Sequence, residues 1–255
     1  MVAMPLHTLR TATRDAWANR GSFLLQVLIM VANDIVWIIF WTLFFHRVGN
    51  LRGWSLQDIL VLWAVLTMAG GAALGVLANC RWVGQMASNG QLDEILVLPV
   101  SPLRYLLTTR INASNIGDMV FGLALFLLAC NPTPERLLLF LATSLCATVV
   151  LVSFLVLAGS LSFFAGSRGE QTDSAFNAVL LFAGYPVDFF GGAIKVILYT
   201  VVPAAFVTGL PVSLMRHFDV ATALIYIAVT AGIAALATTV FTLGLRRYSS
   251  GSIWT

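Results

Sequence analysis

Long apolar stretches, separated by short polar segments, run through almost the whole chain. Five of them are long enough to cross a bilayer, whose hydrocarbon core requires about 20 apolar residues per helix. They lie at 22–45, 58–79, 104–130, 137–165 and 221–245. Alternating apolar and polar strands, which are typical of membrane β-barrels, are absent. The pattern predicts an all-α, polytopic membrane protein with a single transmembrane domain over residues 1–255.

A sixth apolar stretch, at 176–215, is longer and is broken by Pro186, Pro203 and Pro211. We expect a short fifth span at 173–189, followed by two short helices at 191–216 that dip back into the extracellular leaflet. The alternative is a single span at 194–214 that follows an interfacial helix. The re-entrant arrangement is our prediction, and it brings the total to six transmembrane helices.

The residues before the first apolar stretch have the pattern of a helix that lies in the membrane interface. In the segment 5–20, apolar residues recur at three- and four-residue spacing, and Trp17 can sit at the level of the headgroups. The apolar stretch that follows is too long for a signal peptide and no cleavage pattern closes it. We therefore expect it to be retained as the first span.

Composition and charge agree with a membrane protein and suggest its orientation. The chain is 59% hydrophobic and 10% charged, with a mean hydropathy of +0.92, which excludes an ordinary soluble domain. With the N-terminus inside, the cytoplasmic side receives Arg10, Arg14, Arg20, Arg81, Arg104, Arg110, Arg168, Arg246 and Arg247. The outside receives Arg47, Arg52, Arg136, Lys195 and Arg216. The positive-inside rule thus predicts cytoplasmic N- and C-termini.

Motifs for catalysis and for metal binding are absent from the sequence. The one lysine, Lys195, does not follow a glycine-rich loop, so the chain has no P-loop for ATP. The histidines and cysteines show no spacing typical of metal sites, and no nucleophile elbow occurs. We expect no catalytic residues, no metal and no cofactor on this chain, and no nucleic-acid partner.

Four polar residues within the apolar stretches are candidates for a functional role: Asp34, Asn112, Asn115 and Asp118. Burying a carboxylate in a bilayer costs several kcal/mol unless it is protonated, paired or in contact with water, so both aspartates should face the protein interior. These residues could line a substrate path, form a proton relay or lie at a subunit interface. The alternative, favoured for the asparagines, is hydrogen bonding between helices.

Small residues indicate where helices approach each other. Gly71 and Gly75 form a G-x-x-x-G motif in the second span, and Ala228 and Gly232 have the same spacing in the sixth. Such motifs more often serve packing within a bundle than packing between subunits, so we favour the internal role.

The segment between the second and third spans has the pattern of a short amphipathic helix. Asn89 and Gly90 favour a turn, Asp93 and Glu94 would occupy the first helical turn, and Pro99 would end the helix. Leu92, Ile95 and Leu96 would share one face of a helix of about two turns. A helix this short is marginal alone in water, so its apolar face must dock onto the protein itself or onto a partner.

The sequence GQLDEILVLPVSPLRY resembles the cytoplasmic loop of type-2 ABC transporter permeases. The matching residues are Gly90, Leu92, Asp93, Leu96, Pro99, Ser101 and Pro102. Ile95 stands in place of the usual leucine, and Leu98 stands where the family often has threonine or serine. The order of an interfacial helix, six spans and a proline-rich stretch before the last span is similar to that family over the whole chain.

This resemblance implies an exporter subunit in the bacterial cytoplasmic membrane, driven by ATP that a separate chain hydrolyses. The loop 80–103 would hold the coupling helix, whose contacts with the ATPase are expected at Gly90, Leu92, Asp93, Glu94, Ile95, Leu96 and Pro99. Two ATPase subunits carrying Mg-ATP and a second permease would complete the transporter. The second permease would be a non-identical partner or, otherwise, an identical copy.

Two other functions are compatible with the pattern. A proton-coupled secondary transporter could use Asp34 and Asp118, although such proteins usually show internal repeats and none is evident. A structural membrane subunit without transport activity would also lack catalytic groups. The largely apolar bundle favours a lipidic, amphipathic or drug-like cargo over ions.

Overall fold

The computed structural model describes residues 20–130, 132–165 and 170–248, and this part of the chain contains helices and turns but no sheet. The long helices are α2 (Arg20–Val48), α3 (Leu56–Gly71), α7 (Ala113–Ala129), α8 (Pro134–Ser160), α10 (Glu170–Ala183) and α13 (Val220–Leu245). The predicted interfacial helix at 5–20 lies outside the described residues, except for Arg20. The prediction of an all-α polytopic protein is confirmed.

Shorter helices connect the long ones at both ends of the bundle. Those following α3 are the π-helix η1 (Ala72–Val76), the 3₁₀-helix η2 (Ala78–Arg81), α4 (Val83–Ser88), α5 (Asp93–Leu96) and α6 (Pro102–Thr108). Those later in the chain are α9 (Ser162–Ala165), η3 (Val187–Phe189), α11 (Gly192–Thr200), the π-helix η4 (Ala205–Gly209) and α12 (Leu210–Arg216).

Four helices are long and apolar enough to cross a membrane by themselves: Arg20–Val48, Leu56–Val76, Pro134–Phe164 and Val220–Leu245. Two further pairs pass the same test only together, and each pair is sharply bent, by 79° between α6 and α7 and by 77° between α11 and the segment Ala205–Arg216. Among the described residues the number of spans is therefore four, or up to six if each bent pair counts as one. The expected total of six spans and the inward orientation of the termini stay predictions.

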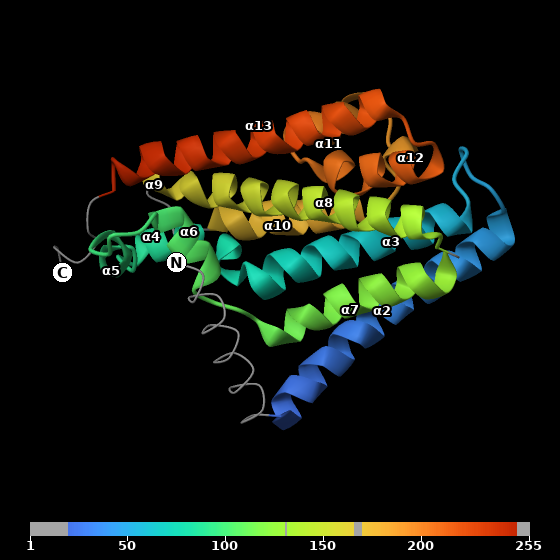
Figure 1. The fold of residues 1–255 in the computed structure, drawn as a ribbon, viewed down its shortest axis with the longest axis horizontal. Helices are drawn as coiled ribbons and strands as arrows, with labels where there is room; N and C mark the ends of the chain where they lie inside the picture. Colours follow the sequence, from blue (N-terminus) through green and yellow to red (C-terminus); the bar gives the residue numbers. More distant parts are fainter. Residues whose placement is uncertain (1–19, 131, 166–169, 249–255) are drawn as a thin grey trace.

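The helices form a layered bundle with α3 and α8 at its centre. Figure 1 shows α13, α8, α3, α7 and α2 in this order from one side of the bundle to the other, and neighbours in the series pack against each other. Of the most apolar part of each helix, 72% is buried in α3 and 61% in α8, but only 6% in α2 and 17% in α13. The two outer helices therefore present apolar faces for lipid or for a partner subunit.

Glycines allow α3 and α7 to approach closely. A Cβ atom added to Gly122 of α7 would lie 2.6 Å from the Ala64 carbonyl oxygen, and one added to Gly71 of α3 would lie 2.5 Å from the Met119 nitrogen. Gly75 faces Ile116 in the same way, so the G-x-x-x-G motif packs inside the bundle, as favoured from the sequence. Gly232 of α13, in contrast, has no atom within 4 Å of an added Cβ.

The third apolar stretch, expected as one helix over 104–130, is broken at 109–112 into α6 and α7. The side chain of Asn112 accepts a hydrogen bond from the Ser114 amide at 3.1 Å and so caps the start of α7. The Asn112 amide donates to the Gly75 carbonyl at 2.8 Å, within the irregular end of α3. Because these bonds satisfy backbone groups that lack helical partners, the break is compatible with a membrane environment.

The region 186–217 forms a bent hairpin whose two ends lie near the start of α3. At the first end of the hairpin, Asp188 accepts a hydrogen bond from the Trp54 indole at 3.1 Å. At its second end, Arg216 forms an ion pair of 2.7 Å with Asp58 and stacks on the Trp54 ring at 4.1 Å. Figure 1 shows that α10 ends and α13 begins at this same end of the bundle. The hairpin thus returns to the end where it started, and its position in the extracellular leaflet stays a prediction.

Charged groups reinforce the base of the hairpin. Lys195 donates to Asp188 at 2.8 Å, and Arg52 donates to the Asp188 carbonyl oxygen at 3.0 Å. The hydrogen bond from Lys195, helped by the one from Trp54, holds the pKa of the Asp188 carboxyl below its ordinary value despite partial burial. The hairpin is therefore held by ionic and aromatic contacts to the loop between α2 and α3.

We predict that Gly122→Val destabilises the protein, because the new side chain would overlap the α3 backbone. Overpacking of this kind costs about 1–3 kcal/mol, and more where backbone must move. Thermal unfolding of the detergent-purified chain measures the effect. Gly232→Val is the matched control, since it adds the same side chain where no atom is near, and an equal loss of stability in both variants would contradict the packing described here.

We also predict that Arg216→Gln weakens the base of the hairpin, because it leaves the half-buried Asp58 carboxylate without its cation. The expected loss in unfolding free energy is about 1–3 kcal/mol. Arg81→Gln is the control: Arg81 also pairs with an aspartate and stacks on a ring, at 2.9 Å and 4.3 Å, but Asp173 is 62% exposed. That exposed pair should contribute only about 0–1 kcal/mol. Adding Asp58→Asn to Arg216→Gln should recover part of the loss.

Candidate functional site

The segment predicted to couple the chain to a partner lies between α4 and α6, at the end of the bundle opposite the base of the hairpin (Figure 1). Gly90 adopts a positive φ of 74°, a conformation that favours glycine and lets the chain turn after α4. Helix α5 then covers only Asp93–Leu96, with both acids in its first turn. The expected helix of two turns is therefore a single turn, stabilised by its packing rather than by its own length.

The apolar side chains of this segment divide into a buried set and an exposed set. Leu92 and Ile95 are 1% and 5% exposed and belong to the core of the protein itself. Leu96 is 42% exposed, Val97 81% and Leu98 37%. The segment is thus attached to its own bundle on one side and presents an apolar surface, Leu96 to Leu98, on the other.

The acidic residues of α5 also differ in their surroundings. Glu94 is exposed, whereas Asp93 is half-buried and lies close to Tyr248, just after α13. Burial raises the pKa of the Tyr248 phenol to about 12, and the nearby Asp93 carboxylate acts in the same direction. Asp93 therefore faces the end of the last long helix, while Glu94 is available at the surface.

A polar cavity of about 540 Å³ borders the coupling segment. Glu94 and Ile95 contribute to its lining from α5, and Trp82, Gln85, Tyr105 and Arg110 contribute from the flanking elements. This cavity adds a hollowed, polar surface beside the exposed apolar residues. Sequence analysis did not identify it, because its lining residues come from four separate short segments.

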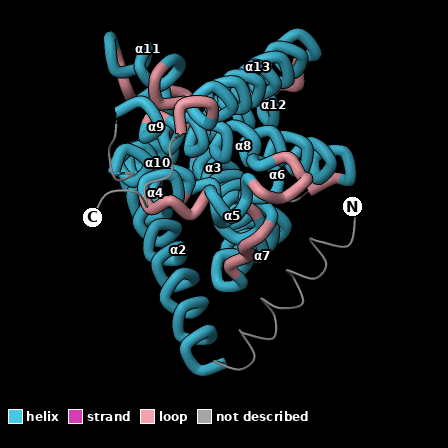
Figure 2. The backbone as a smooth tube through the Cα atoms, turned by 90° about the vertical axis from the view of Figure 1, so that its left-hand side faces the viewer, coloured by secondary structure: helices cyan, strands magenta, loops and turns pink. Residues whose placement is uncertain are grey.

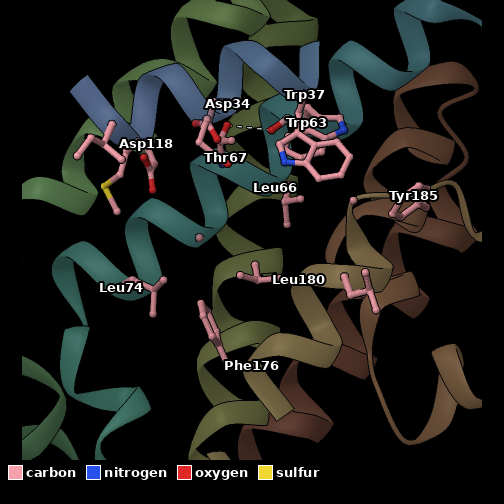
Figure 3. A pocket seen from close by; sticks show the side chains of 16 residues that line it. Asp34, Trp37, Trp63, Leu66, Thr67, Leu74, Asp118, Phe176, Leu180 and Tyr185 are labelled. Atoms are coloured by element: carbon pink, nitrogen blue, oxygen red, sulfur yellow. Dashed lines mark hydrogen bonds between the residues drawn. The ribbon is translucent and has the colours of Figure 1, made fainter. Parts of the chain in front are cut away.

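A second cavity, of about 630 Å³, lies among α2, α3, α7 and α10 and will be called the central cavity. Figure 3 shows its lining, in which Asp34 lies between Asp118 on one side and the indole rings of Trp37 and Trp63 on the other. The structure thus places the two aspartates predicted as pathway candidates at one cavity. Asn112 and Asn115 are not part of its lining.

Hydrogen bonding also distinguishes the two asparagines from the two aspartates among the four polar candidates. The Asn115 amide donates to the Leu74 carbonyl at 3.1 Å, and Asn112 caps α7, so both asparagines satisfy backbone groups. The Asp34 Oδ2 and Asp118 Oδ1 atoms, in contrast, are buried and have no hydrogen-bond partner. The asparagines therefore support the fold, and the aspartates are left for interactions with something else.

Metal ligands do not gather in the described residues: no group of three or more His, Cys, Asp or Glu side chains lies close enough to hold an ion. The two aspartates of the central cavity alone provide too few protein ligands for a dedicated metal site.

Comparison with known families gives one match, which covers most of the chain. The family model described as "ABC-2 family transporter protein" matches residues 29–252. No curated protein and no solved structure gives a significant match. The resemblance to type-2 ABC permeases noted from the 90–102 motif is confirmed. Since the match includes the coupling segment, the central cavity and the hairpin, the chain belongs to the ABC-2 transporter family and is a multi-pass membrane component of a transporter.

Proposed function

We propose that this chain is the membrane-spanning subunit of an ATP-driven exporter, and that a separate ATPase drives it through the segment 90–98. The observation that carries the proposal is the division of the apolar residues in that segment. An exposed Leu96-Val97-Leu98 surface is unfavourable in water, and it projects from the end of the bundle that the charge distribution assigns to the cytoplasm.

The proposed coupling requires that a push on the segment reach the membrane helices. Leu92 and Ile95 fix α5 in the core, and α5 packs against α6. The preceding helix, α4, packs against α8 and α10. A displacement imposed at Leu96 to Leu98 would therefore be transmitted to the centre of the bundle through closely packed side chains, which deform little.

The exposure of each side chain supports a smaller set of proposed contacts with the ATPase than the sequence motif. Leu96, Val97, Leu98 and Glu94 form the exposed surface, whereas Leu92 and Ile95 would act indirectly by positioning it. Gly90 and Pro99 would set the turns on either side of α5. Such a division of roles could not be assigned from the helical pattern, which places Leu92, Ile95 and Leu96 on one face.

The remaining subunits are proposed from the family and from the exposed helices. Two ATPase subunits would carry Mg-ATP, and a second permease, non-identical or identical, would cover an apolar face on α2 or α13. The complex would lie in the bacterial cytoplasmic membrane. Family membership gives no support to the alternative of a proton-coupled secondary transporter.

We predict that Val97→Asp abolishes coupling without unfolding the chain, because it places a charge in the proposed contact while removing nothing from the core. Complete burial of a valine or leucine contributes about 1.5–3 kcal/mol, so affinity for the ATPase should fall by about tenfold or more. The measurements are co-purification with a co-expressed ABC ATPase and the hydrolysis rate of that ATPase in the complex. Val48→Asp, an exposed position at the end of α2, is the control. Unchanged association and hydrolysis in Val97→Asp would contradict the proposal.

We further predict that Leu92→Ala and Leu96→Ala differ in their effects on stability. Leu92 is fully buried, so its truncation should lower the free energy of unfolding by about 2–5 kcal/mol. Leu96 is largely exposed, and its truncation should change stability by about 0.5 kcal/mol or less. Thermal or denaturant unfolding of the two purified variants provides the comparison, and equal losses would contradict the division into a buried and an exposed set.

A further inference from the structure

We propose that the central cavity binds an organic cation whose uncharged part is largely apolar and can pack against aromatic side chains. This inference rests on the proposed function, because it names the class of cargo that such an exporter would carry. It depends on three properties of the cavity: its charge, its aromatic wall and its opening.

Two carboxyl groups line the cavity. Asp34 is only 7% exposed, and its Oδ2 atom has no hydrogen-bond partner. Asp118 lines the same cavity with an unpartnered, buried Oδ1 atom. The lining residues include no lysine, arginine or histidine. Two carboxyl groups that the protein leaves unpaired in an apolar setting would be best satisfied by a cation that enters the cavity.

The wall beside the aspartates is aromatic. Trp37 and Trp63 stack with ring centroids 5.3 Å apart and an interplanar angle of 22°, and Tyr185 meets Trp37 edge-on at 6.3 Å. The faces of such rings attract cations, most strongly quaternary or delocalised ones. The Trp63 indole nitrogen also lacks an acceptor, so the wall has a free donor for a polar atom of the ligand.

The size and the other lining residues favour an amphipathic molecule over a simple ion. A volume of about 630 Å³ is in the range that holds a drug-sized ligand. Away from the aspartates the lining is apolar and includes Leu66, Leu74, Phe176 and Leu180. A small hydrated ion would lose its water there without gaining enough oxygen ligands, whereas an apolar body would fill the space.

The cavity opens toward the outer surface of the bundle. Its lining includes Ile29 of α2 and Leu181 of α10, both 60% exposed. Figure 2 shows the first half of α2 diverging from the other described helices. In a membrane the opening would face lipid or a partner permease, and amphipathic cations already concentrate near the headgroups of an anionic leaflet.

Tetraphenylphosphonium is a suitable probe, because it combines one delocalised positive charge with aromatic groups. Tetraphenylborate has the same shape and the opposite charge. We expect the purified full-length chain in lipid nanodiscs to bind the phosphonium saturably, as measured by equilibrium dialysis and by quenching of tryptophan fluorescence. Empty nanodiscs serve to subtract partition into lipid.

The test variant is Asp34→Asn combined with Asp118→Asn, which keeps the shape of both side chains. It should weaken phosphonium binding by about 10- to 100-fold, as expected for the loss of charge interactions at short range in a partly desolvated site. Glu135→Gln, which removes an exposed carboxylate at the start of α8, is the control and should not change binding. Should the double variant fail to fold, Asp118→Asn alone, at the less buried position, should weaken binding by about tenfold.

Equal affinity for the phosphonium and the borate, or full phosphonium binding by the aspartate variants, would overturn the proposal. In that case the aspartates would be protonated structural groups. Because the assay uses the chain without any ATPase, its result is independent of the coupling experiment. A failure of cation binding would therefore leave the proposed coupling intact, and a failure of coupling would leave the binding result intact.

Discussion

The structure depends on one constraint: in a bilayer, backbone groups that lose their helical partners must find others within the protein. The long helices satisfy themselves, but α3 ends in a π-helix and a 3₁₀-helix, and the hairpin contains a second π-helix. At the first break, the Asn115 side chain and the Asn112 backbone amide donate to carbonyl groups of η1. At the second, the Tyr226 hydroxyl donates to the Phe206 carbonyl at 2.8 Å, and Thr208 donates to the Ala183 carbonyl at 2.9 Å. Several polar groups within apolar segments thus satisfy irregular backbone.

The two aspartates of the central cavity differ from these polar groups. Among the described residues, the buried Oδ2 of Asp34 and Oδ1 of Asp118 form no hydrogen bond to irregular backbone, and no lysine, arginine or histidine lines the cavity. Asp58 and Asp188, in contrast, bind arginine, lysine or tryptophan at the base of the hairpin. The two carboxyl groups of the central cavity are therefore the groups to which the proposed cation would bind.

The segment 90–98, which we propose as the coupling segment, combines buried and exposed apolar residues. Leu92 and Ile95 fasten a single helical turn to the bundle, and Leu96 to Leu98 remain uncovered. A turn this short would not be stable alone, so its shape is supplied by the core beneath it. Helix α5 packs against α6, and the neighbouring helix α4 packs against α10, which lines the central cavity.

The sequence by itself determined the helical membrane class, most of the long helices, the internal packing of Gly71 and Gly75, and the family motif around Gly90 to Pro102. These follow from local pattern: apolar length, small-residue spacing and turn residues act over a few neighbouring positions. Only the tertiary structure decided that α6 and α7 are separate, that Val97 is exposed while Leu92 is buried, and that Asp34 and Asp118 share a cavity from which Asn115 is excluded. Each of those outcomes depends on which other helix a side chain meets, and that contact brings together residues far apart in the chain.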